Sequence, residues 1–158
     1  ACLVGSEMCI RDRNKPDATK ESIVDGWFYS GDAGFFDEEG FLFIHDRVKD
    51  MIVSGGENIY PAEVENALMS HDEILDAAVV GVPDEKWGES VKGFVVIGES
   101  SLSEEEIISY TRSQIAAYKC PKSIEFIKEL PRNPSGKILR RELRDPYWEG
   151  IDRKVSGN

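Results

Sequence analysis

The sequence predicts an α+β fold for the stretch of roughly one hundred residues that begins near Asp50, with helices packed against a small three-stranded sheet. Two observations indicate this class. First, 41% of the 158 residues are hydrophobic and 31% are charged, which is enough apolar material for a buried core. Second, the patterns follow the order strand, helix, strand, strand, helix, strand, loop, helix. No apolar run approaches the roughly eighteen residues that a membrane span needs.

The residues before Asp50 are expected to lie outside this domain. Residues 1–13 show neither a periodic pattern nor the layout of a signal peptide, and we interpret them as a leader that does not match the rest of the chain. Residues 17–24 fit a short helix. Two apolar strands, Phe35-Phe36 and residues 41–44, flank a polar turn that ends in Gly40, which is typical of a β-hairpin.

The predicted domain opens with a short buried strand over residues 51–53 and a helix that begins at Pro61. Proline suits the first turn of a helix because its missing amide would have no partner there, and acidic residues favour the positive end of the helix dipole. The acidic residues are Glu63 and Glu65, and the apolar stripe of this helix comprises Val64, Ala67 and Leu68.

Two strands rich in valine come next, over residues 74–82 and 91–97. Ser103 and Glu106 have the spacing of a capping box, so they predict the start of the next helix. The predicted apolar face of that helix comprises Ile107, Ile108, Ile115 and Tyr118, and after it come a third strand over 124–128, a loop over 131–137 and a last helix over 138–144.

The net charge is −11, which argues against a general binder of nucleic acid or of anionic membranes. The charge is unevenly distributed, because residues 119–158 hold 10 basic and 6 acidic side chains while the rest of the chain is strongly acidic. Two interpretations remain open at this point. The basic segment is either a solvated surface that attracts the acidic body, or a local site for a polyanionic ligand.

The three cysteines, Cys2, Cys9 and Cys120, have no metal-ligand spacing and leave one residue unpaired. Free thiols indicate a reducing compartment, and with no recognisable signal peptide we expect a cytoplasmic protein. The two histidines, His45 and His71, lie on unrelated segments. A zinc site or a histidine-based triad therefore has too few candidate residues.

Four clusters of residues are candidates for chemistry, and each has a plain structural interpretation as well. Tyr29-Ser30-Gly31-Asp32 places a carboxylate on a turn, where it can bind two vicinal hydroxyls or simply cap the turn. The charged run Asp46–Asp50 is either a solvated linker or a hinge whose charges exchange partners.

The other two clusters contain glycine. Ser54-Gly55-Gly56-Glu57-Asn58 lets backbone approach a ligand closely, or forms an ordinary tight turn. Asn133-Pro134-Ser135-Gly136-Lys137 presents one lysine just before a helix. That lysine is either solvated or able to deliver a point charge to a developing anion.

Taken in order, these clusters resemble motifs at the C-terminal end of the adenylate-forming enzymes, the superfamily of acyl-CoA synthetases, nonribosomal-peptide adenylation domains and luciferases. Trp27–Asp32 is similar to the family's aromatic–Thr–Gly–Asp motif, with serine for threonine. Residues 46–65 are similar to its hinge motif, and residues 133–137 to its C-terminal lysine motif. The resemblance covers residues 14 to about 150.

The resemblance implies roles for four residues in a reaction that joins a carboxylate to ATP. Asp32 would bind the ribose hydroxyls of ATP and of the acyl-AMP, with Arg47 assisting. Lys49 would be the hinge about which a small lid domain turns. Lys137 would bridge the carboxylate and the phosphate while acyl-AMP forms and pyrophosphate leaves.

After the lid has turned, the resemblance implies a second site for coenzyme A, which would attack the acyl-AMP. The predicted residues of this channel are Ser54, Gly55, Gly56, Trp87, Lys119 and Lys122. The cofactors implied are ATP with Mg²⁺ and CoA as co-substrate. The family's magnesium-binding glutamate, phosphate loop and acid pocket belong to a large N-terminal domain, which we expect as the partner of this chain.

The predicted organisation is therefore a leader (1–13), the end of the large domain with its β-hairpin (14–48), the mobile lid domain (49–150) and a tail (151–158). Val53 stands where luciferases carry a lysine, and no carrier-protein serine motif comes after Gly150. The first observation disfavours luciferase chemistry, and the second weakens the peptide-synthetase interpretation. Residues 54–61 and the ending Asp145–Trp148 most resemble fatty or aryl acyl-CoA ligases. We expect the chain alone to be inactive. The alternatives are an adenylation domain that loads a carrier protein and a non-catalytic binding module.

Overall fold

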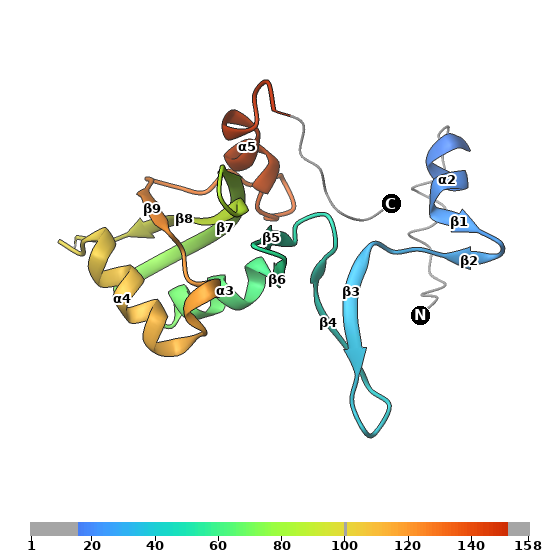
Figure 1. Ribbon diagram of the computed structural model, residues 1–158, viewed down its shortest axis with the longest axis horizontal. Coiled ribbons are helices and arrows are strands. Elements are labelled where there is room, and N and C mark those ends of the chain that lie inside the picture. Colours follow the sequence, from blue (N-terminus) through green and yellow to red (C-terminus); the bar gives the residue numbers. More distant parts are fainter. Residues whose placement is uncertain (1–15, 100, 152–158) are drawn as a thin grey trace. The chain divides into compact units, whose positions relative to one another are not determined.

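The computed structural model describes residues 16–99 and 101–151, and the chain divides into two compact units, one up to Ile44 and one from His45 onward. The leader predicted at 1–13, Cys2 and Cys9, and most of the predicted tail lie outside the described residues. The first unit contains α2 (Pro16–Ser22), β1 (Ile23–Val24), β2 (Trp27–Phe28), β3 (Asp32–Phe36) and the start of β4 (Leu42–Arg47) (Figure 1).

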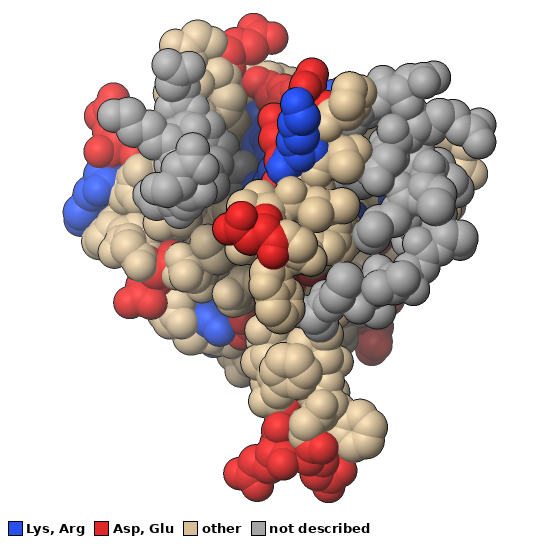
Figure 2. Space-filling model, turned by 90° about the vertical axis from the view of Figure 1, so that its right-hand side faces the viewer, with Lys and Arg blue, Asp and Glu red and all other residues tan. Residues whose placement is uncertain are grey.

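The first unit contains the predicted β-hairpin. Strands β3 and β4 pair, and the Asp37 carboxylate closes their turn by accepting hydrogen bonds from the amides of Glu39 (3.0 Å) and Phe41 (2.8 Å). Acidic side chains gather at the end of this hairpin (Figure 2). The predicted helix over 17–24 is shorter at its C-terminal end, because the β-branched pair Ile23-Val24 leaves the helix and pairs with β2.

The second unit is built on a mixed sheet of five strands, whereas the sequence predicts a sheet of three and a separate short strand over 51–53, which joins the sheet. The strands are β5 (Ile52–Ser54), β6 (Glu57–Ile59), β7 (Ile74–Asp84), β8 (Gly88–Ile97) and β9 (Ser123–Phe126), in the order β6-β5-β8-β7, with β9 parallel to β8. The α+β class is confirmed, but the strand number is wrong. The polar residues Glu57 and Asn58 hide β6 in the sequence, since both are exposed and carry no apolar alternation.

Helices cover both faces of this sheet, as Figure 1 shows. On one face, α3 (Pro61–Met69) and α4 (Glu104–Gln114) pack on a core that includes Val79, Val95 and Ile124. On the other face, α5 (Arg140–Arg144) and the 3₁₀ helix η2 (Asp145–Tyr147) cover a second core, which comprises Ala78, Val80, Phe94 and Leu130. A second 3₁₀ helix, η1 (Ala117–Lys119), precedes β9. None of the described helices is long and apolar enough to cross a membrane.

The outer edge of β7 is covered by side chains instead of another strand. The amide of Val79 donates to Glu65 on α3 at 2.9 Å, and the carbonyl of Gly81 accepts from Trp148 Nε1 at 2.9 Å. The amide of Ala77 donates to Asp76 at 3.1 Å. An open strand edge invites pairing with other chains, so these side chains protect the sheet.

Helix α4 begins with the predicted capping box, in which the Ser103 hydroxyl accepts from the Glu106 amide and the Glu106 carboxylate accepts from the Ser103 amide. The helix ends before the last two residues of its predicted apolar face, Ile115 and Tyr118. It ends at Gln114 because Ile115 is extended, with φ −132° and ψ 168°. Tyr118 therefore lies in η1 and is 52% exposed, although Ile115 still packs against the core.

Replacing Ser103 by alanine is expected to lower the free energy of unfolding by about 1 kcal/mol, because the amide of Glu106 at the start of α4 loses its side-chain partner. Urea denaturation followed by circular dichroism measures the change. Ser101→Ala is the matched control, since Ser101 is exposed and lies outside the helix, and it should leave the midpoint unchanged. Equal midpoints for the two variants would contradict the role of the cap.

Candidate functional site

The segment that carries Lys137, residues 131–139, is a closed loop that we call the lysine loop. Its base is joined by the amide of Leu139, which donates to the carbonyl of Pro131 at 2.8 Å, and by a β-bridge between Arg132 and Ile138. Leu130 and Ile138 pack in the second core at this base. The sheet therefore fixes the two ends of the loop.

Asn133 organises the interior of the lysine loop. Its side-chain oxygen accepts three hydrogen bonds, from the amide of Ser135 (3.0 Å), the hydroxyl of Ser135 (2.8 Å) and the amide of Lys137 (2.9 Å). Gly136 has a φ of +83°, a conformation that favours glycine. Lys137 is exposed, and within the described residues its amino group has no hydrogen bond or ion pair. The loop thus presents a lysine that is available to a ligand.

The predicted hinge lies in a short turn between β4 and β5. The amides of Asp50 and Met51 both donate to the carbonyl of Arg47, at 3.0 and 3.2 Å, so the turn that contains Lys49 is closed. The Asp46 carboxylate accepts from the amide of Ala62 at 2.9 Å, in the first turn of α3. A carboxylate is favoured at this positive helix end. The residues flanking Lys49 are therefore bound to the body of the second unit.

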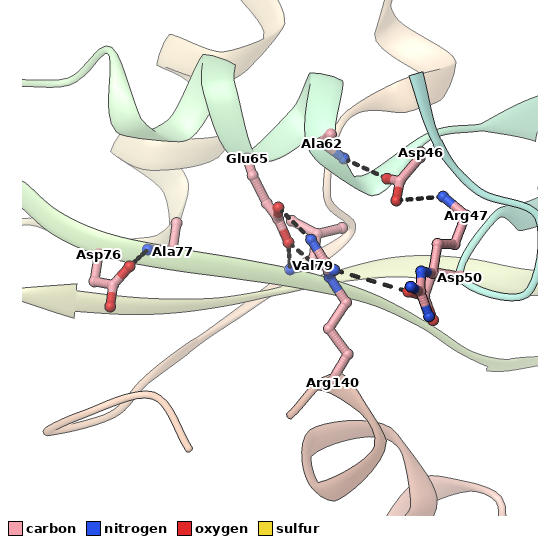
Figure 3. A network of polar contacts seen from close by, with 9 residues as sticks. All are labelled: Asp46, Arg47, Asp50, Ala62, Glu65, Asp76, Ala77, Val79 and Arg140. Carbon is pink, nitrogen blue, oxygen red and sulfur yellow. Dashed lines mark hydrogen bonds and ion pairs between the residues drawn. The ribbon is translucent and has the colours of Figure 1, made fainter. Parts of the chain in front are cut away.

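Arg140 on α5 joins the helices on the two faces of the sheet (Figure 3). Its guanidinium donates to both carboxylate oxygens of Glu65, at 2.7 and 3.2 Å, and lies 3.8 Å from Asp50 beside the hinge turn. Burial alone would lower the pKa of Arg140, but the hydrogen bond and charge of Glu65 raise it above its usual value. The pair anchors the helix that comes after the lysine loop.

Replacing Arg140 by alanine is expected to lower the free energy of unfolding by about 2 kcal/mol, because the largely buried Glu65 carboxylate would lose its charged partner. The pair is partly solvated, so the loss is smaller than for a fully buried pair. Urea denaturation measures it. The neighbouring Arg141 is the matched control, because its side chain is 80% exposed and its contact with Asp145 is long, at 3.8 Å. A loss for Arg140→Ala no larger than that of Arg141→Ala would refute the anchoring role.

The glycine turn between β5 and β6, Gly55-Gly56, has positive φ at both residues, +61° and +88°. The amide of Gly55 donates to the carbonyl of Trp87 at 2.9 Å, and the Trp87 ring lies against Gly55. A Cβ on Gly55 would be 2.7 Å from Trp87 Cε3, whereas a Cβ on Gly56 would meet nothing within 4 Å. Gly55 is therefore needed for the close approach of this ring.

An open pocket of about 650 Å³ lies beside this turn. It brings together Ser54, Gly55, Trp87 and Lys122, four of the six residues predicted for a coenzyme A channel. Gly56 and Lys119 do not line it. The sequence missed the other lining residues, which come from separate elements that only the fold brings together: Glu57, Ile108, Arg112, Ala117, Tyr118, Cys120 and Pro121.

Cationic groups gather at this pocket. The ammonium groups of Lys86 and Lys122 lie 4.5 and 5.2 Å from the centroid of the Trp87 ring, and Lys122 also contacts Asp84 at 3.3 Å. The amide of Trp87 donates to Asp84, and this bond is the main reason why the pKa of Asp84 is lowered. Lys122 and Arg112 line the pocket together with the acidic Glu57, whereas Lys86 lies outside the lining. The two cationic side chains make the pocket wall suitable for an anionic ligand.

Two groups near the pocket are less available than their residue types suggest. Lys119 donates to both carboxylate oxygens of Glu63, at 2.6 and 2.7 Å, and this hydrogen bonding raises the pKa of Lys119. Burial raises the pKa of the Cys120 thiol, which therefore stays protonated at neutral pH. The role of Lys119 toward coenzyme A stays a prediction.

Asp32 lies in the first unit, at the start of β3. It is exposed, and its amide donates to the hydroxyl of Ser30 at 3.1 Å, so the serine of the predicted nucleotide motif shapes this turn. Arg47, predicted to assist Asp32, ends β4 in the second unit. Within the described ranges, no group of three His, Cys, Asp or Glu side chains is placed to hold a metal ion.

Known proteins match this chain closely. The family model of the AMP-binding enzyme C-terminal domain matches residues 63–137. The chain is 49% identical, over 98% of its length, to a fatty acid–[acyl-carrier-protein] ligase of Streptomyces coeruleorubidus. It is 48% identical, over 92% of its length, to a long-chain-fatty-acid–CoA ligase of Mycobacterium tuberculosis. The chain spans 30% and 29% of the lengths of these two relatives.

A solved structure agrees with these matches. The o-succinylbenzoate CoA synthetase of Bacillus subtilis, in complex with its acyl-adenylate intermediate, superposes with a TM-score of 0.74 and 44% sequence identity. The match covers 80% of this chain and 26% of that one. The chain therefore belongs to the adenylate-forming superfamily and corresponds to the C-terminal part of its members.

Proposed function

We propose that the second unit of this chain is the lid of an ATP-dependent acyl-CoA synthetase. The reaction has two steps. A carboxylate attacks the α-phosphate of ATP and gives acyl-AMP and pyrophosphate, and a thiol then attacks the acyl carbon and releases AMP. Lys137 stabilises the negative charge that develops in the first step. The pocket beside Gly55 receives the thiol substrate in the second step.

One observation carries this proposal: the second unit holds two candidate sites, the lysine loop and the pocket beside Gly55, that are built from different elements. Lys137 is presented by the lysine loop, and among the described residues none of 131–139 lines the pocket. A single active site can use both features in turn only if the unit rotates. We place the hinge of this rotation at the short turn around Lys49, near the start of the second unit.

A carboxylate of the fatty-acid class is the acid that we propose. The two relatives described above, from S. coeruleorubidus and M. tuberculosis, are named for fatty acids, and the first of them matches nearly the whole chain. The acid pocket itself is expected in the large domain, together with the magnesium ligand. Mg²⁺ would there neutralise charge on the phosphates of ATP. We further propose a cytoplasmic location, where ATP and CoA are both available.

The second candidate acceptor is a carrier protein, and the fatty acid–[acyl-carrier-protein] ligase among the relatives favours it. Both acceptors end in the same pantetheine thiol, so the pocket can take either arm. They differ beyond that arm. Coenzyme A ends in a nucleotide that carries phosphates, which suits Lys122 and Arg112, while a carrier protein requires a protein surface.

A hybrid ligase distinguishes the two acceptors. In it, this chain replaces the matching C-terminal part of the M. tuberculosis long-chain-fatty-acid–CoA ligase. With a long-chain fatty acid and ATP, we expect the hybrid to form the thioester with free CoA. We expect the Lys122→Ala variant of the hybrid to have a raised KM for CoA. Efficient transfer to a phosphopantetheinylated carrier protein, with little transfer to CoA, would instead establish the second candidate.

A further inference from the structure

Arg132 links the lysine loop to the sheet. One nitrogen of its guanidinium, Nη1, donates to the carbonyl of Gly136 at 2.6 Å, and Nη2 donates to Asp76 Oδ2 at 2.7 Å. Gly136 immediately precedes Lys137. Arg132 thus lies between a carboxylate of β7 and the peptide group that carries the lysine.

Asp76 lies in the regular part of β7, just after a β-bulge. Ile74 pairs with Ile97 and Asp76 with the adjacent Val96, so Leu75 is the extra residue of this bulge. From Asp76 onward the side chains alternate between the two faces of the sheet, so Asp76 shares its face with Ala78 and Val80. That face contacts the base of the lysine loop.

The other contacts of the lysine loop fix its ends and its internal turn. Pro131 and Leu139 close its base, and Asn133 holds its turn. Within the described residues, Arg132 and Asp76 connect the tip of the loop to a strand of the sheet by hydrogen bonds. Arg132 is 41% and Asp76 29% exposed at the side chain, so their ion pair contributes little to folding stability.

We propose that Arg132 and Asp76 are positioning residues for Lys137, holding its loop at the angle that adenylation requires. This inference rests on the role proposed above for Lys137. A catalytic charge must lie within a few tenths of an ångström of its place, and small displacements reduce the rate strongly. The pair therefore acts on the rate of one half-reaction and leaves folding nearly unchanged.

The first test uses the chain itself. Asp76→Asn keeps the shape of the side chain but removes the charge that holds Arg132. Amide hydrogen exchange, measured by NMR, should become faster at Gly136 and Lys137 in this variant, while the amides of α4 keep their rates. Unchanged exchange at Gly136 and Lys137 would overturn the proposal, because the loop would then be held without Asp76.

The second test uses the hybrid ligase and measures the two half-reactions separately. Asp76→Asn and Arg132→Ala should each slow ATP–pyrophosphate exchange about fivefold through kcat, with thioester formation from supplied acyl-AMP unchanged. The double variant should be no slower than either single variant, because both changes break the same link. Arg132→Lys should restore part of the rate, and Arg141→Ala, which alters an exposed pair, should have no effect.

The outcomes separate this inference from the proposed function. An adenylation rate in Lys137→Ala equal to that of the parent hybrid would refute the role proposed for the lysine itself. Loss of adenylation in Lys137→Ala with normal rates in Asp76→Asn would refute the positioning role alone. Multiplicative losses in the double variant would also refute it, since Arg132 would then act independently of Asp76.

Discussion

Adenylation by the hybrid ligase is expected to fall by about two to three orders of magnitude when Lys137 is replaced by alanine, because a preorganised charge at the transition state is removed. The lysine is exposed and, among the described residues, its amino group makes no ion pair, so the replacement leaves the fold intact. ATP–pyrophosphate exchange measures the first half-reaction. Thioester formation from supplied acyl-AMP measures the second and should be largely retained.

Two controls make this result specific to Lys137. Lys128→Ala removes another exposed lysine of the basic segment and should leave both half-reactions unchanged. A melting temperature equal to that of the parent would exclude unfolding as the cause. Equal losses in the two half-reactions would contradict the role given to Lys137, since they would indicate a general defect of the lid.

Replacing Gly55 by alanine is expected to raise the KM for CoA at least tenfold, a change of about 1.4 kcal/mol in apparent binding. The new methyl group would lie 2.7 Å from Trp87 Cε3, so the ring must move within the pocket. Initial rates of thioester formation at varied CoA concentration measure the effect. Adenylation should be retained, because the lysine loop does not share this turn.

Gly56→Ala separates the contact with Trp87 from backbone strain. Gly56 also has a positive φ, +88°, so alanine is strained there as well, but its methyl group would meet no atom within 4 Å. We expect a clearly smaller rise in the KM for CoA. If the two variants raise this KM equally, strain in the turn is the cause, and the proposed contact between Gly55 and Trp87 is not needed for the pocket.

The sequence predicts best those helices and strands that are determined by residues close together in the chain. The capping box at Ser103 and the proline at the start of α3 depend on residues within one turn of helix, and both lie where the sequence places them. The valine-rich strands β7 and β8 are also found, each extended by a few residues. The strand β6 was missed, because its polar residues face solvent and show no alternation.

The site was only partly predictable for a related reason. Motif resemblance identifies Lys137 and the glycine turn, since each is a short contiguous segment. The pocket wall combines residues from α4, η1 and the β7–β8 turn, and no pattern along the chain connects them. Likewise Arg132 and Asp76 are 56 residues apart, and no pattern along the chain predicts their contact.

The measurement that tests the central claim most directly is ATP–pyrophosphate exchange by three proteins: this chain alone, the large domain of the M. tuberculosis relative alone, and the two joined as the hybrid. The account predicts no exchange by the chain and slow exchange by the large domain. It predicts a gain of at least about a hundredfold on joining them, because the lid brings Lys137 to the reacting phosphate. Real turnover by the isolated chain, or a hybrid no faster than the large domain, would contradict it.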